Sequence, residues 1–97
     1  PEVVYTFSLE QNYPNPFNPT TVISYQLPMN SFVTLKVYDL LGRTAATLVN
    51  GTQGAGVQKV EWNGGVASGV YYYRLEAVSL TDPNNRFVQV KKMVLLK

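Results

Sequence analysis

Apolar and polar residues alternate with a period of two along most of the chain, which is the pattern of half-buried β-strands. Ile23, Tyr25 and Leu27, for example, are separated by serine and glutamine. No stretch carries apolar residues at helical spacing without interruption by glycine, proline or β-branched runs. We therefore expect strands at residues 5–9, 21–27, 32–38, 44–49, 57–62, 70–78 and 86–96.

Turn-forming residues separate these runs at short intervals. The turn signals are Pro28-Met29-Asn30, Leu41-Gly42, Asn50-Gly51, Asn63-Gly64-Gly65 and Asp82-Pro83-Asn84-Asn85. About seven short strands with a turn roughly every 8–12 residues predict an all-β, seven-stranded antiparallel immunoglobulin-like β-sandwich. We expect one domain over residues 1–97, with residues 1–6 as the end of a linker to an upstream domain.

The alternation also predicts which side chains point inward. The expected core consists of Ile23, Tyr25, Leu27, Val33, Leu35, Val37, Val60, Trp62, Tyr71, Tyr73 and Leu75. The last strand is ambiguous, because large apolar residues occupy both odd and even positions. A bulge near Lys91 and Lys92, or burial of both faces, would explain this.

Composition excludes several kinds of chemistry. The 97 residues include no cysteine and no histidine, so disulfides, thiolate nucleophiles and histidine-based triads are excluded. We expect no enzymatic activity and no cofactor, since general acid–base catalysis most often uses histidine. A net charge of +2 is too small to indicate nucleic acid as the main partner, and no apolar run is long enough to span a membrane. The start at Pro1 reads as part of a longer chain.

A proline-rich stretch follows the first expected strand. It consists of Tyr13, Pro14, Asn15, Pro16, Phe17, Asn18 and Pro19, and we call it the proline loop. Its three prolines fix φ and remove three hydrogen-bond donors, so it cannot be a central strand. Either it is a rigid elbow with Phe17 plugging the end of the sandwich, or it is a recognition surface; single aromatic residues in such loops usually pack inward.

Five sequence blocks in a fixed order carry a family resemblance. They are Gln11-Asn12 with the proline loop, Ile23-Ser24-Tyr25-Gln26-Leu27-Pro28, Val37-Tyr38-Asp39-Leu40-Leu41-Gly42, Val60-Glu61-Trp62-Asn63-Gly64 with Ala67-Ser68-Gly69-Val70-Tyr71-Tyr72-Tyr73-Arg74-Leu75, and the terminal Lys92 to Lys97. With these blocks the chain resembles the C-terminal sorting domains of the type IX secretion system. Those domains are related in fold to the immunoglobulin-like domain of flagellar hook-capping proteins.

This resemblance implies a non-catalytic tag that carries a covalently attached upstream cargo from the periplasm across the outer membrane, in Bacteroidota and their relatives. The implied partners are the translocon and a sortase-like peptidase, and the implied location is the outer-membrane surface or the extracellular space. Cleavage is expected within residues 1–10. The implied recognition segment is Lys92, Met93, Val94, Leu95, Leu96 and Lys97.

The sequence leaves alternatives open. A last strand rich in lysine resembles a protected edge strand, and its edge could accept a strand from a translocon component, or the lysines could simply keep the strand soluble. The rival function is a carbohydrate-binding or adhesive module, for which Tyr72 is the candidate ligand-facing aromatic; alternation sends its neighbours inward and leaves it alone outside. A spacer role is a third possibility. Asp39 and Asp82 are more simply turn residues than calcium ligands.

Overall fold

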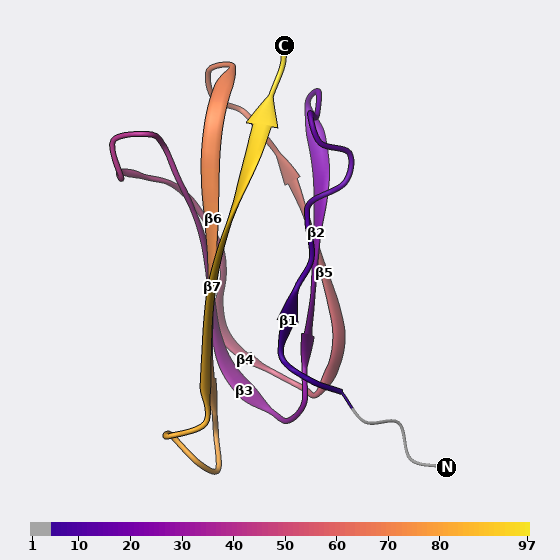
Figure 1. Ribbon diagram of the computed structural model, residues 1–97, viewed down its shortest axis with the longest axis vertical. Coiled ribbons are helices and arrows are strands. Elements are labelled where there is room, and N and C mark those ends of the chain that lie inside the picture. Colours follow the sequence, from indigo (N-terminus) through magenta and orange to yellow (C-terminus); the bar gives the residue numbers. More distant parts are fainter. Residues whose placement is uncertain (1–4) are drawn as a thin grey trace.

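Two antiparallel β-sheets pack face to face in the computed structural model, which describes residues 5–97 (Figure 1). Within these residues all regular structure is β. The strands are β1 Ser8–Leu9, β2 Thr20–Leu27, β3 Ser31–Tyr38, β4 Thr44–Gln53, β5 Gly56–Asn63, β6 Gly69–Ser79 and β7 Arg86–Leu95. The predicted seven-stranded immunoglobulin-like sandwich is confirmed. Residues 1–4, which include most of the expected linker, lie outside the described part.

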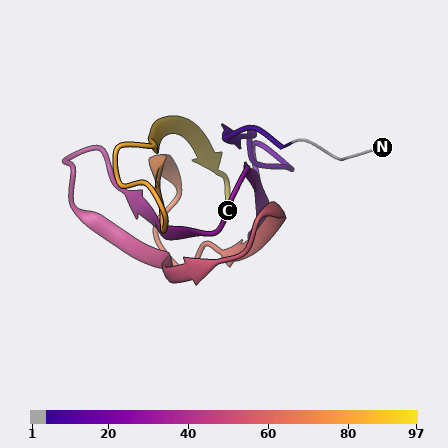
Figure 2. The ribbon, with the colours of Figure 1, turned by 90° about the horizontal axis from the view of Figure 1, so that it is seen from below.

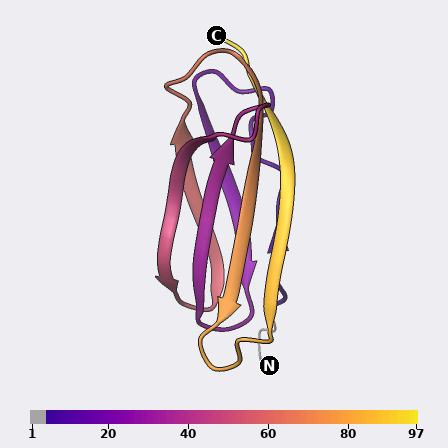
Figure 3. The ribbon, with the colours of Figure 1, turned by 90° about the vertical axis from the view of Figure 1, so that its left-hand side faces the viewer.

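The order of strands is β1-β2-β5 in one sheet and β4-β3-β6-β7 in the other. The β3–β4 and β6–β7 connections stay within the larger sheet, whereas the remaining connections from β2 onward cross between sheets. Viewed from one end, the two layers curve around the interior (Figure 2). Viewed from the side, the four-stranded sheet lies face-on with β7 at its edge (Figure 3).

The core is built from the inward positions of both sheets. Buried apolar side chains are Leu9, Phe17, Ile23, Tyr25, Leu27, Val33, Leu35, Val37, Trp62, Tyr71, Tyr73, Leu75, Ala77, Met93 and Leu95. The predicted core is therefore confirmed except at Val60, which is half-buried and packs against it. Val60 lies on β5, an edge strand of the smaller sheet, where the opposing sheet covers it incompletely.

Two local predictions were wrong. Asn50 and Gly51 do not form a turn, because β4 continues through them to Gln53 and pairs with β3, and the chain reverses at Gly54 and Ala55 instead. The full length of β3 offers hydrogen bonds to β4, and these outweigh the local preference of Asn-Gly for a turn.

Neither alternative for the last strand holds: there is no bulge near Lys91 and Lys92, since β7 pairs with β6 in one continuous register, and the two faces are not both buried. The apolar residues of both parities have a simpler origin. Odd positions of β7 face the core, and the even-numbered valines lie on the outer face of an edge strand.

Candidate recognition site

The proline loop lies against the C-terminal end of β7. The proline loop and the predicted recognition segment are therefore in direct contact. The Phe17 N–H donates to the Val94 carbonyl (2.9 Å), and the Leu96 N–H donates to the Phe17 carbonyl (3.0 Å). The Asn15 Oδ1 accepts from the Val94 N–H at 3.0 Å. Phe17 and Leu95 thus form an isolated parallel bridge. The loop acts as a short extra partner for the end of an edge strand.

The Phe17 side chain is the apolar anchor of this contact, with only 1% of its surface exposed. Its ring centroid lies 5.6 Å from that of Trp62, which in turn lies 5.9 Å from that of Tyr71 in an edge-on arrangement. Gly64 makes room for the ring: a Cβ there would lie 3.0 Å from both Phe17 and Leu95. The expectation that Phe17 plugs the end of the sandwich is confirmed.

Polar contacts fix the start of the loop. The buried Asn12 side chain donates to the Thr21 hydroxyl (3.0 Å) and to the Pro14 carbonyl (3.2 Å). The Asn12 N–H donates to the Tyr73 hydroxyl (2.9 Å), and this hydroxyl donates to the Glu10 carbonyl (2.7 Å). Burial raises the pKa of Tyr73 to about 12, although the Asn12 hydrogen bond acts in the opposite direction. The tyrosine therefore stays protonated and ties the residues just before the proline loop to β6.

The terminal segment divides into inward and outward side chains. Met93 and Leu95 are fully buried, whereas Lys92, Leu96 and Lys97 are exposed. Val94 is half-buried. Only the outward members of the predicted recognition segment can contact a partner while the domain stays folded.

Side chains outside the predicted segment also hold it. The Gln11 amide donates to the Lys92 carbonyl (2.7 Å), and the Ser68 hydroxyl accepts from the Lys97 N–H (2.9 Å). Gln11, Asn12 and Ser68 stand in the motif blocks of the sequence, but the pattern of these blocks assigns them no role. Alternation identifies strand faces but carries no information about which loop side chain reaches a distant strand.

The rest of the proline loop is exposed. Tyr13 has 80% of its surface accessible, and the remaining prolines and asparagines of the loop are exposed too. The elbow and recognition hypotheses are therefore compatible: one ring anchors the loop, and the other side chains form an outer surface beside the terminal segment.

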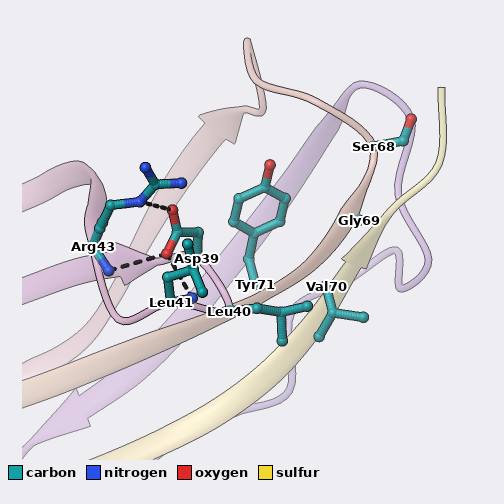
Figure 4. A pocket seen from close by; sticks show the side chains of 8 residues that line it. All are labelled: Asp39, Leu40, Leu41, Arg43, Ser68, Gly69, Val70 and Tyr71. Atoms are coloured by element: carbon teal, nitrogen blue, oxygen red, sulfur yellow. Dashed lines mark hydrogen bonds and ion pairs between the residues drawn. The ribbon is translucent and has the colours of Figure 1, made fainter.

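A shallow cavity of about 190 Å³ lies at the same end of the molecule, between the β3–β4 turn and the start of β6 (Figure 4). Asp39 organises the turn as predicted, since its Oδ1 accepts from the backbone N–H groups of Leu41 (2.9 Å) and Arg43 (3.0 Å). The Arg43 Nε lies 2.8 Å from the Asp39 Oδ2. Leu40 and Leu41 are left 66% and 78% exposed. Tyr71, from the aromatic row beside Phe17, lines the cavity.

Tyr72 is not alone on the outer face, contrary to the sequence interpretation. Strand register places Tyr38 beside it on β3 and Lys92 beside it on β7. Tyr38 was not recognised as an outer neighbour because the register between strands is decided by the pairing of whole strands.

Among residues 5–97, no group of three or more histidine, cysteine, aspartate or glutamate side chains could hold a metal ion. The same residues contain no helix that is long and apolar enough to cross a bilayer.

The fold and the loop contacts define a small immunoglobulin-like β-sandwich whose terminal strand is secured by a conformationally restricted loop. The family model for the secretion system C-terminal sorting domain matches residues 11–94, and the chain belongs to this family. It is thus a sorting signal of type IX secretion, which implies interaction with that machinery and export to the cell surface or the extracellular space. No curated protein matches the chain.

Proposed function

We propose that this domain carries an attached upstream cargo from the periplasm across the outer membrane, and that the translocon recognises its terminal segment as presented by the folded sandwich. The domain itself performs no chemistry. A sortase-like peptidase then cleaves within residues 1–10, of which residues 5–10 belong to the described structure and include β1.

One observation carries this proposal: the proline loop and residues 92–97 hold each other in place. The loop supplies both a donor and acceptors to the edge of β7, with Phe17 as its anchor. A free C-terminal tail would sample many conformations, and ordering it on binding would cost free energy. A segment already held in extended form avoids much of that cost. The exposed Lys92, Leu96 and Lys97 side chains are the surface that we assign to recognition.

The test is the location of a fluorescent cargo fused to the chain, in cells that possess type IX secretion and in a strain that lacks it. Deleting residues 92–97 would remove Met93 and Leu95 from the core, so loss of export could reflect unfolding. A sharper variant replaces only Lys92, Leu96 and Lys97 by alanine.

We expect the triple variant to fold, as judged by circular dichroism, and to remain in the periplasm. Substituting Val57 and Lys59 by alanine is the matched control, because both are exposed on the opposite sheet. Normal export of the triple variant would overturn the role of the terminal segment. Periplasmic retention of the unaltered fusion would overturn the proposed function itself.

A second candidate function is carbohydrate binding, favoured by the Tyr38–Tyr72 pair in register on the outer face. Two neighbouring rings offer more stacking surface than one. Titration with neutral oligosaccharides, monitored by amide shifts of Tyr72 and its neighbours, tests this. Trp62 is a poor probe because it is buried. Saturable binding that Tyr72→Ala abolishes would support the second function.

A further inference from the structure

The outer edge of β7 is occupied only at its C-terminal end. Both the N–H and the C=O of Val94 bond to the proline loop, so they point away from β6. In an antiparallel pair these directions alternate along the strand, and the β6–β7 register is continuous. The N–H and C=O groups of Val88 and Val90 therefore also point away from β6. Within residues 5–97 they have no hydrogen-bond partner.

The side chains on the outer face of this open stretch follow a symmetric pattern. Arg86, Val88, Val90 and Lys92 occupy alternate positions, so two valines lie between two cations. The valines are 44% and 51% exposed. The Arg86 guanidinium contacts Glu76, but Lys92 forms no ion pair within the described residues. An exposed apolar edge is normally avoided or masked by charge.

The charge of the whole face favours an acidic partner. The outer face of the four-stranded sheet carries Lys36, Arg74, Arg86 and Lys92 against Glu76 alone, a net charge of +3. On the other sheet, β5 presents one lysine and one glutamate, a net charge of zero. The positive charge is therefore concentrated on the sheet that has β7 at its edge.

We propose that the stretch 86–92 of β7 is a docking site for an extended acidic segment of a partner protein, which adds to the sheet as a fifth strand beyond β7. Such a segment would hydrogen-bond to the main chain of Val88 and Val90. On the outer face, alternate side chains of the partner segment would be acidic, apolar, apolar and acidic. They would lie opposite Arg86, Val88, Val90 and Lys92. Because this pattern is the same in both directions, it suits a parallel or an antiparallel strand.

A second copy of the chain is a poorer occupant, because it would place two outer faces of net charge +3 side by side. In a symmetric antiparallel pairing centred on Gln89, Val88 faces Val90 of the other copy, and Arg86 faces Lys92. Like charges directly opposite each other on paired strands are destabilising. The β4 edge is also less suitable as a docking strand, because two register shifts in its pairing with β3 disturb its regularity.

The test uses the 97-residue chain and a blocked peptide of sequence Glu-Thr-Val-Thr-Val-Thr-Glu. Binding is followed by NMR titration and by hydrogen exchange of the Val88 and Val90 amides. We expect saturable shifts along 86–92 and slower exchange at both amides. A peptide with the same side chains but N-methyl groups at every amide between the two glutamates is the control for main-chain pairing in either strand direction, and it should not bind.

Charge is tested with Lys92→Glu and with Lys59→Glu, the same change on the opposite sheet. Lys92→Glu should weaken binding of the glutamate peptide about twofold to fivefold, as expected for an exposed ion pair, and should strengthen binding of a lysine-flanked peptide. Lys59→Glu should leave both affinities unchanged, because its charge is screened over the intervening distance.

Val90→Pro provides a second test of the main-chain contact. The Val90 N–H points outward, so proline removes no bond to β6 and is tolerated at such edge positions. Binding should be lost while the circular dichroism spectrum is retained. Equal binding of the N-methylated peptide, unchanged exchange at Val88 and Val90, or dimerisation of the chain through β7 would each overturn the proposal.

Discussion

Replacing Phe17 by alanine should remove a large part of the stability of this domain. The side chain is almost fully buried, so its transfer to water alone costs about 1.5–3 kcal/mol. The cavity left beside Trp62, Gly64 and Leu95 raises the expected loss to about 3–5 kcal/mol. A 97-residue domain has a total free energy of unfolding of about 5–15 kcal/mol, so this is a severe change.

The assay is urea unfolding followed by Trp62 fluorescence and by circular dichroism, together with a thermal scan. The midpoint temperature should fall by at least about 12 °C, given roughly 4–8 °C per kcal/mol for a domain of this size. Tyr13→Ala is the matched control, because it removes an exposed aromatic ring from the same loop. It should change stability by less than about 0.5 kcal/mol.

The loss of stability should also be localised at one end of the molecule. If Phe17 anchors the loop, amide exchange at Val94 and Leu96 should accelerate in the alanine variant, since both N–H groups donate to the loop. A loss of stability below about 1.5 kcal/mol, or an equal loss in Tyr13→Ala, would show that the loop is not held by its buried ring.

The remaining predictions concern the same end of the domain. Gly64→Ala should destabilise by about 1–3 kcal/mol through overpacking, whereas Gly65→Ala, where a Cβ has a nearest neighbour at 3.6 Å, should be nearly neutral in urea unfolding. Asn15→Ala should cost about 0.5–1.5 kcal/mol and speed hydrogen exchange at Val94, and unchanged exchange would contradict the assigned bond. Because burial raises the pKa of Tyr73 to about 12 against 10.0 for the free side chain, the unfolded state loses its proton first. The stability from this group should be complete below pH 10 and should be lost as the pH rises toward 12; in Tyr73→Phe, the fall in urea stability over that window should be smaller.

The alternation of apolar and polar residues was sufficient to predict the fold class. Each strand of a sandwich has one face that packs on the core and one that faces solvent. This requirement produces the alternation seen at positions such as 23–27 and 33–37. The pattern failed where pairing overrode local preference, as at Asn50 and Gly51. It was ambiguous in β7, because an edge strand can carry apolar side chains on both faces without burying both.

The sequence by itself determined the stiffness of the proline loop, the need to bury Phe17 and the turn built on Asp39. These features depend on prolines, on one isolated aromatic ring and on an Asp-x-x-Gly spacing. Each acts over only a few residues, so the local sequence is sufficient to predict it. Only the tertiary structure decided that Asn15 reaches Val94, that Tyr38 lies beside Tyr72, and that the open edge of β7 begins where the loop ends. These contacts join residues far apart in the chain, and the packing of the two sheets as a whole selects them.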